Sequence, residues 1–171
     1  VLLVMIMGTA FGAVQGYIIT KFDLQPFIIT LAGMFFCRGL TAVISQNTIT
    51  IDNATWVGLA SYRIDLGVGF ISIGAVVAIL SIIAAAIVLK FTRFGRTVFA
   101  IGGSESSAAL MGLPVFRTKV MVYAISGFCS SLGGLAYSLI MLTGYNLHGL
   151  GMEMDAIASS VIGGTLLTGG V

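Results

Sequence analysis

Few side chains in this sequence carry groups that could do chemistry, and their spacing restricts what that chemistry can be. Glu153 and Asp155 are two residues apart, so on a helix they would not face one another, which argues against a pair of catalytic carboxylates. His148 has no cysteine and no second histidine beside it, so we expect no metal site. Arg38 stands inside an apolar run, where a charged side chain is costly and needs an explanation.

The composition indicates which elements must position these residues. Of the 171 residues, 58% are hydrophobic and 8% are charged, and the net charge is +2. A soluble domain carries about 25% charged residues, so we exclude soluble enzymes and disordered or collagen-like chains. The low net charge leaves no footprint for nucleic acid. The sequence therefore predicts an all-α fold, a polytopic transmembrane helix bundle that takes up residues 1–171 as part of one domain.

Motifs for enzymatic chemistry do not occur in the sequence. It contains no GxxxxGK[ST], GxSxG, HExxH or CxxC pattern, so we expect neither an enzyme nor an ATP site of its own. Cys37 and Cys129 both lie in apolar runs, with no metal-ligand spacing and no disulfide framework. We therefore expect no metal and no cofactor.

Runs without charge mark the predicted membrane spans. A spanning helix needs about 20 apolar residues, and four stretches supply them: 1–19, 26–44, 68–89 and 120–142. A fifth piece, 154–171, is shorter and is interrupted by Gly163–Gly164 and Gly169–Gly170. We interpret it as a broken half-helix, with Asp155 near its N-terminus, where carboxylates are favoured.

Basic residues set the predicted orientation. The loop 45–67 has Arg63 as its only basic residue, and the loop 143–153 has none. By the positive-inside rule, we expect the loop 90–119 to be cytoplasmic. Its basic residues are Lys90, Arg93, Arg96, Arg117 and Lys119.

Glycines predict where helices touch. Gly8, Gly12 and Gly16 form two consecutive GxxxG steps, which put them on one face where a neighbouring helix can approach closely. We interpret this face as a packing seam, and we expect Gly133 and Gly134 to do the same in the fourth span.

The loop 90–119 is too long to be a bare connection between neighbouring helices, and its pattern predicts a short helix. Gly102–Gly103 interrupts the chain, Ser104 is placed as an N-cap, and Glu105 lies in the first turn. Gly112 is placed as a C-cap, and Pro114 ends the helix. Two interpretations stay open: an amphipathic helix on the membrane surface, and a docking knob for a cytosolic partner.

Four sequence blocks resemble one transporter family. They are PFIITLAGMFFCRG (26–39), TRFGRTVFAIGGSESSAALMGL (92–113), YAISGFCSSLGGLAYS (123–138) and GLGMEMDAIASSVIGGTLLTGG (149–170). In order and spacing they resemble the permeases of monosaccharide-type ABC importers, the ribose and galactofuranose group. Within this group, the segments 26–36 and 155–170 are most similar in sequence to a galactofuranose-type permease subunit.

The resemblance implies a mechanism and partners. Such a permease lies in the bacterial inner membrane, among its lipids, and pairs with a second permease subunit, expected here to be a different chain. A periplasmic binding protein delivers the monosaccharide, possible substrates including galactofuranose, and cytosolic ABC ATPase subunits dock on a coupling helix. The residues implied for that coupling are Gly95, Arg96, Gly102, Gly103, Ser104, Glu105, Ala108, Ala109 and Gly112.

The chain departs from the family pattern at one residue and in its length. Ser104 stands where members usually have Asn. The helices that precede and follow these blocks in the family are missing, and the chain starts and stops inside apolar or glycine-rich runs. We therefore expect an internal piece of a longer permease.

The substrate path or gate is expected where charges and glycines interrupt the apolar sequence. Arg38 has two interpretations. It has a functional role, in which it binds sugar hydroxyls or holds the end of a broken helix, or its side chain extends to the outer membrane interface. For Glu153 and Asp155, a structural role at a helix start competes with a role in the path. The residues of this expected path are Arg38, Glu153, Asp155, Gly163 and Gly164. The alternative functions are a secondary transporter with discontinuous helices and a small membrane protein whose basic loop binds lipid.

Overall fold

Helices make up most of the structure, a computed structural model that describes residues 1–61, 63–65 and 70–164. In chain order the elements are α1 (Leu2–Phe22), α2 (Pro26–Ile44), β1 (Ile49–Thr50), α3 (Ala54–Ser61), β2 (Arg63–Asp65), β3 (Phe70–Ser72), α4 (Ile73–Phe91), α5 (Arg93–Gly103), α6 (Glu105–Leu110), α7 (Val115–Met141), β4 (Thr143–Gly144) and α8 (Met152–Ile162). The predicted all-α class is confirmed.

Four helices of the described chain are long and apolar enough to cross a membrane: α1, α2, α4 and α7. The span predicted at 26–44 coincides with α2, and the one at 1–19 ends about one turn before α1 does. The span predicted at 68–89 is wrong at its start, because Phe70–Ser72 pair with Arg63–Asp65 and α4 begins only at Ile73. Residues 66–69 lie outside the described part.

The segment predicted as the loop 90–119 is mostly helical. It contains α5 and α6, and α7 begins at Val115 rather than at residue 120. Pro114 is the N-cap of α7 and does not end α6. A proline suits a helix start because its missing N–H would have no partner there. Gly102–Gly103 belongs to the last turn of α5, so the interruption comes one residue later, at Ser104.

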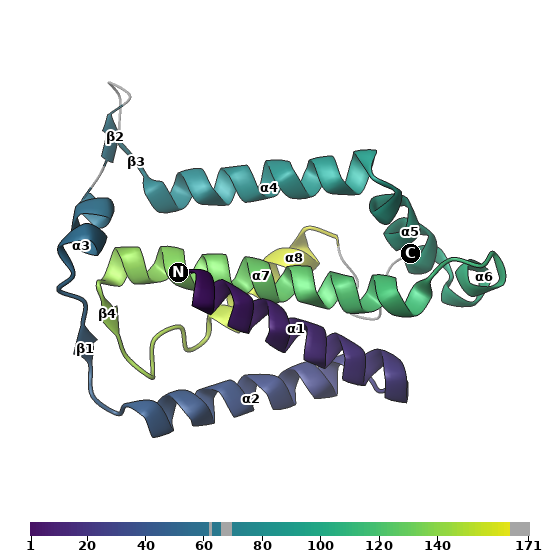
Figure 1. Ribbon diagram of the computed structural model, residues 1–171, viewed down its shortest axis with the longest axis horizontal. Coiled ribbons are helices and arrows are strands. Elements are labelled where there is room, and N and C mark those ends of the chain that lie inside the picture. Colours follow the sequence, from purple (N-terminus) through teal and green to yellow (C-terminus); the bar gives the residue numbers. More distant parts are fainter. Residues whose placement is uncertain (62, 66–69, 165–171) are drawn as a thin grey trace.

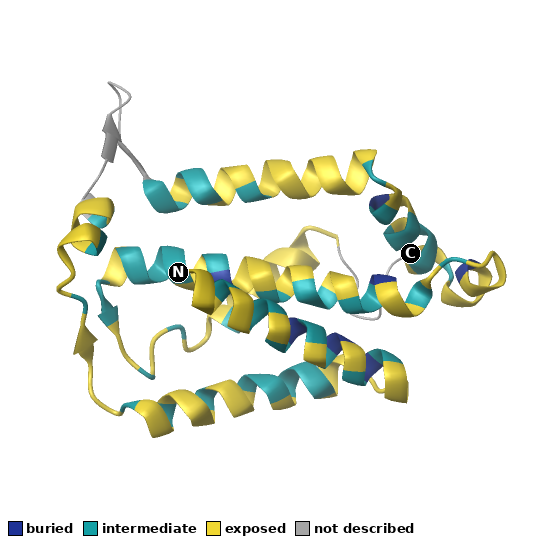
Figure 2. Ribbon diagram, in the orientation of Figure 1, coloured by how far each residue is buried: buried dark blue, intermediate teal, exposed yellow. Residues whose placement is uncertain are grey.

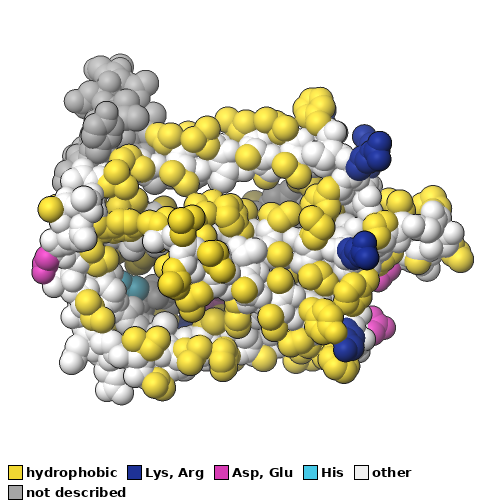
Figure 3. Space-filling model, in the orientation of Figure 1, with side chains coloured by type: hydrophobic (Ala, Val, Ile, Leu, Met, Phe, Trp, Pro, Cys, Tyr) yellow, Lys and Arg dark blue, Asp and Glu magenta, His cyan; other side chains and the backbone are white. Residues whose placement is uncertain are grey.

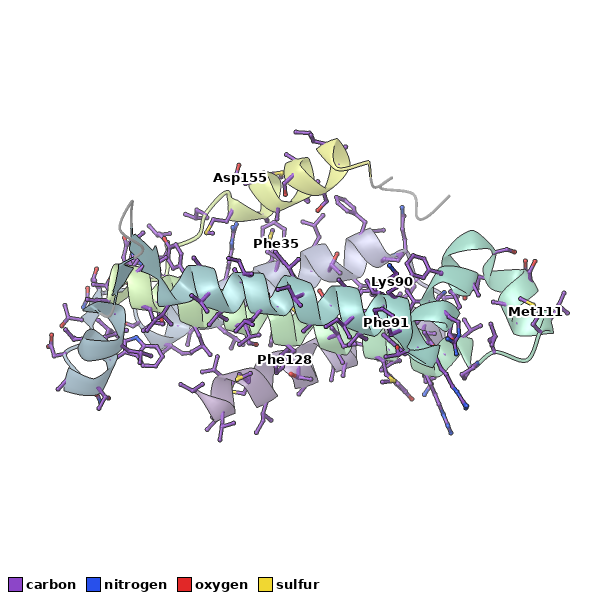
Figure 4. All side chains as sticks on the ribbon, turned by 90° about the horizontal axis from the view of Figure 1, so that it is seen from above. Phe35, Lys90, Phe91, Met111, Phe128 and Asp155 are labelled. Atoms are coloured by element: carbon purple, nitrogen blue, oxygen red, sulfur yellow. The ribbon has the colours of Figure 1, made fainter. Side chains whose placement is uncertain are left out.

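The long helices form a layer with one helix on each side. In Figure 1, α4, α7 and α2 run side by side, and α1 crosses in front of α7. Figure 4, turned by 90°, shows α1 and α8 on opposite faces of this layer. Helices α2 and α4 have no buried residue, and their apolar side chains are suited to lipid or to neighbouring helices.

The closest packing joins α1 to α7 through glycines. A Cβ placed on Gly12 would lie 2.3 Å from the carbonyl oxygen of Tyr123, and one on Gly8 would lie 1.8 Å from the hydroxyl of Ser131. Gly12, Gly16 and Ile19 are the buried residues of α1 (Figure 2). The predicted seam is therefore confirmed.

The two other glycines expected to serve a seam do not. A Cβ on Gly133 or on Gly134 would meet nothing within 4 Å, so this prediction is wrong. The glycine of α7 that the close approach does require is Gly127, where a Cβ would lie 2.3 Å from the carbonyl oxygen of Gly8. Gly127 lies six residues before Gly133, which is nearly two helical turns earlier than the predicted pair.

The two ends of the bundle differ in charge and in structure. At one end β1 pairs antiparallel with β4, with Ile49 opposite Gly144, so the loop before α3 and the loop after α7 meet there. At the other end lie α5 and α6, and the Lys and Arg side chains visible on this face of the molecule gather there (Figure 3). The loops 45–67 and 143–153 therefore share one end of the bundle and the segment 90–119 lies at the other, as the sequence predicts.

The α1–α7 seam gives a first prediction. Gly12→Ala in the full-length protein puts a methyl group against the Tyr123 backbone, which cannot yield as a flexible side chain would. We expect a loss of about 1–3 kcal/mol in the free energy of unfolding, measured by titration with a denaturing detergent. Gly39→Ala is the control, because a Cβ there meets nothing within 4 Å. Equal stability of the two variants would contradict the packing.

Candidate functional site: a charged tie at one end and a protruding helix at the other

An ion pair joins α2 to the start of α8. The guanidinium of Arg38 donates through Nη2 to Oε1 of Glu153 over 2.7 Å. The two side chains are 34% and 30% exposed, so both are half-buried. Of the two functional alternatives for Arg38, the geometry corresponds to the pinning of a broken helix end.

The N-terminal turn of α8 stabilises a charged carboxylate. Gly151 is its N-cap, with φ of 91°, and Glu153 and Asp155 both lie in its first turn. The pKa of the Glu153 carboxyl is lowered, because the backbone N–H of the same residue hydrogen-bonds to it and because Arg38 lies beside it. Both effects favour the charged form.

The structure brings Glu153 to Arg38 but not the other residues of the expected path. Asp155 is exposed, and in Figure 4 it points away from the bundle. Gly163 is the C-cap of α8, and Gly164 has φ of 95°. One 11-residue helix separates these glycines from Glu153 by about 15 Å.

The half-helix expected at 154–171 has different limits. It begins at Met152, two residues earlier than expected, because Gly151 provides the N-cap conformation. It ends at Ile162, and residues 165–171, with Gly169–Gly170, lie outside the described part of the chain. Within α8 only Glu153 is even half-buried, so the ion pair with Arg38 is a principal tie of this helix to the bundle.

At the opposite end, α5 begins with a sharp corner after α4. Thr92 is its N-cap, and the Thr92 hydroxyl accepts a hydrogen bond from the Gly95 N–H over 3.2 Å. A Cβ on Gly95 would lie 2.0 Å from the carbonyl oxygen of Leu89. Gly95, expected as a coupling residue, thus allows α5 to fold back tightly against the end of α4.

Helix α6 protrudes beyond this corner, capped at both ends. The Ser104 hydroxyl accepts from the Ser107 N–H over 3.3 Å, which confirms the predicted N-cap. At the other end the N–H of Leu113 donates to Ala108 and the N–H of Gly112 donates to Ala109, while Gly112 has φ of 75°. This pattern is a Schellman motif, in which glycine takes the left-handed position after the cap residue.

A second ion pair fixes α6 to the bundle. Lys119, in the first turns of α7, binds the carboxylate of Glu105. Glu105 opens α6, where a negative charge also suits the helix dipole. The docking knob, which we define as residues 105–112, is therefore held by its caps and by a charged contact to α7.

The large exposed side chains of the docking knob, Leu110 and Met111, are not among the coupling residues expected from the sequence, and one expected residue, Ala108, is buried. Ala108 is 0% exposed, whereas Leu110 is 90% and Met111 is 67% exposed. Met111 lies at the far tip of the protruding segment in Figure 4. Ala108 is buried and Leu110 is exposed because of the way α6 packs against its neighbours. The sequence of a six-residue helix does not show which of its faces will be buried. The remaining expected residues, Arg96, Gly102, Gly103 and Ala109, are exposed.

Comparison with known proteins supplies the family. The family model described as "Branched-chain amino acid transport system / permease component" matches residues 1–171. The inner membrane ABC transporter permease protein YjfF of Escherichia coli is 42% identical over 170 residues, covering 99% of this chain and 51% of the relative. The fructose import permease protein FruG of Bifidobacterium longum is 38% identical, covering 99% and 52%.

A third relative agrees. The ribose import permease protein RbsC of Escherichia coli is 38% identical over 170 residues, covering 96% of this chain and 51% of the relative. The chain thus spans about half the length of the curated relatives it matches. No solved structure matches the chain.

The tie between α2 and α8 gives the second prediction. Arg38→Ala removes the partner of Glu153, and we expect the backbone amides of α8 to exchange hydrogen about threefold faster. The exchanged double variant, Arg38→Glu with Glu153→Arg, should recover part of the protection. Arg96→Ala, an exposed arginine at the opposite end, is the control. Unchanged exchange in Arg38→Ala would show that other contacts hold α8.

The same tie has an expected pH dependence. A carboxyl with a lowered pKa contributes stability above its unfolded pKa of about 4.3 and loses it as the pH falls through the folded value. The protection of α8, corrected for intrinsic exchange, should therefore be the same at pH 7 and at pH 5.5 and fall only at more acidic pH. A loss between these two values would contradict the lowered pKa of Glu153.

Proposed function

The chain belongs to the family described as the permease component of branched-chain amino acid transport systems, and on this premise we propose that it forms the membrane-spanning part of an ABC importer for a monosaccharide. The family consists of transporter components and not of enzymes, and the chain is a multi-pass inner-membrane protein. The family description names amino acids, but the relatives named for a substrate are fructose, ribose and L-arabinose permeases. Their similarity over nearly the whole chain supports a sugar.

The observation that carries the proposal is the docking knob. It projects from the basic end of the bundle and exposes Leu110 and Met111. An apolar tip that is held rigid and kept outside the bundle is typical of a protein interaction site. Positive charge near the tip supports a cytoplasmic location for that end, where an ABC ATPase would bind.

The partners follow from this arrangement. Since the sequence contains no GxxxxGK[ST] motif, ATP is bound by separate cytosolic ATPase subunits and not by this chain. A second permease subunit, a different chain, completes the pathway, and a periplasmic binding protein delivers the sugar to the end that carries β1 and β4. Closure of the ATPases around the docking knob would move the bundle as a rigid body between outward-open and inward-open states.

In this mechanism the residues of the two sites have distinct roles. Leu110 and Met111 fill an apolar cleft on the ATPase, and Ala109, Gly112 and Arg96 border that contact. Ala108, Ser104, Glu105 and Gly95 act through the shape of the docking knob, because they are buried, cap its ends or bind its neighbours. At the outer end Arg38 and Glu153 hold α8 beside the substrate path.

The third prediction tests the docking knob. Leu110→Asp should weaken binding of the ATPase about tenfold or more, because it removes a buried apolar contact and buries a charge instead. Binding is measured by co-purification from membranes that contain the whole importer, and ATP-dependent sugar uptake into proteoliposomes should fall with it.

Two further variants make this test specific. Leu59→Asp places the same charge on an exposed leucine of α3 at the other end and should leave ATPase binding intact. Ala108→Asp should fail differently, by unfolding the knob itself, since Ala108 is 0% exposed. Full uptake by Leu110→Asp, or uptake that needs no ATPase, would favour a secondary transporter.

The fourth prediction concerns the substrate. We propose galactofuranose as the transported sugar, on the similarity of the sequence blocks 26–36 and 155–170 to galactofuranose-type permeases. Uptake of labelled galactofuranose is measured with the complete importer. Unlabelled galactofuranose should inhibit this uptake at lower concentration than unlabelled D-ribose, D-fructose or L-arabinose. Stronger competition by one of these three would replace galactofuranose but keep the importer.

A further inference from the structure

A pocket of about 370 Å³ lies at the outer end of α2, beside the Arg38–Glu153 pair. Its walls come from α2, from the segment before and within β1, and from the loop after β4. The β1–β4 pairing and the hydrogen bond from the Ile51 N–H to the Leu142 carbonyl hold these loops together over the end of α2. The residues that matter below are Cys37, Arg38, Tyr145, Asn146 and His148.

One wall of this outer pocket carries an unsatisfied acceptor. The side-chain oxygen Oδ1 of Asn146 is buried, and no described residue donates a hydrogen bond to it. A buried acceptor without a partner costs about 1–3 kcal/mol, and a hydroxyl donor brought by a ligand would relieve that cost. The neighbouring Arg38 has five N–H donors, of which Nη2 binds Glu153.

Aromatic rings bound the same pocket and are held in place. The ring of His148 packs edge-to-face on Tyr145, with centroids 5.6 Å apart, and on Tyr137, with centroids 5.8 Å apart. A ring surface beside a few converging polar groups is the usual make-up of a small-molecule site, and about 300 Å³ is the lower limit for such sites. The volume suits one sugar ring.

A second cavity lies next to the outer pocket. Cys37 lines it and lines a second cavity of about 470 Å³ between α1, α2 and α7. The inner cavity is lined by polar side chains that include Gln15, Ser126 and Ser130. Hydroxyl and amide groups at this depth of a membrane bundle provide partners for a polar solute that moves along α2.

We propose that the outer pocket is the first binding site for the monosaccharide on this chain. Asn146 Oδ1 accepts a hydrogen bond from a sugar hydroxyl, the free N–H groups of Arg38 donate to ring or hydroxyl oxygens, and His148 and Tyr145 bound the ring. The same guanidinium of Arg38 binds Glu153 at the start of α8. Sugar binding in the outer pocket is therefore coupled to the position of α8. The inference rests on the proposed function as a sugar importer and adds to it a location and its residues.

The test uses Cys37 as a reporter of occupancy. Cys37 and Cys129 are the cysteines of the chain, both exposed, and Cys129 lines a separate cavity between α4 and α7. In the complete importer with Cys129→Ser, a methanethiosulfonate reagent should modify Cys37. Saturating amounts of the transported sugar, identified from galactofuranose, D-ribose, D-fructose and L-arabinose by uptake, should slow this modification about tenfold.

A matched set of variants ties the protection to Asn146. Asn146→Leu removes the acceptor at similar size, and the sugar concentration for half-protection should rise about tenfold, the loss of one buried hydrogen bond. Asn146→Asp keeps an acceptor and should retain protection within about threefold. Leu147→Ala, an exposed neighbour that does not line the pocket, should behave as the parent does.

The outcomes separate the two proposals. ATP-dependent uptake of a sugar without protection of Cys37 would overturn the outer pocket as its binding site and leave the importer function standing. Protection that is equal in Asn146→Leu and in the parent would overturn the role of Asn146. Absence of ATP-dependent uptake of all four sugars would overturn the sugar-importer function, and the outer-pocket proposal with it.

Discussion

The structure depends on the close contact between α1 and α7, where backbone meets backbone. At Gly12 and Gly127 there is no room for even a methyl group, and small residues are what allows helices to associate in lipid, where no hydrophobic force drives them together. Helix α7 has 27 residues and is about 40 Å long. Clamped along α1, it acts as a rigid rod whose first turns bind the docking knob and whose last turn leads into β4 and the outer pocket.

The charged residues are few, and the two ion pairs of the described chain sit at opposite ends of this rod. Lys119–Glu105 fixes α6 to the start of α7, and Arg38–Glu153 fixes α8 to α2 near the other end. A charge near a membrane is tolerated when it is paired, so each pair holds an otherwise weakly packed helix in one position. Because α8 buries so little of its surface, a change at Arg38 is expected to loosen α8, whereas the α1–α7 seam would remain.

Local signals in the sequence were sufficient for the parts of the fold that are local. Charge-free runs located the spans, GxxxG steps located the seam, and Ser104 located an N-cap, because each depends on residues within a few turns. The contact of Arg38 with Glu153 spans 115 positions, and the β1–β4 pair also joins distant loops, so neither leaves a local trace. The outward direction of Leu110 likewise depends on how α6 leans against α7 and α5, which spacing within a six-residue helix does not encode.

The arrangement also explains how one end of the proposed importer can influence the other without a continuous chain of charges. In the proposed importer, a push on Leu110 would be transmitted to α7 through the capped α6 and the Glu105–Lys119 pair, because a helix is stiff along its axis. At the outer end the loop after β4 carries Asn146 and His148, while α2 carries Arg38. Movement of α7 relative to α2 therefore changes the width of the outer pocket directly, and the rigid α1–α7 contact ensures that α1 moves with α7. The moving boundary then lies between α2 and the α1–α7 pair, which is where the inner cavity lies.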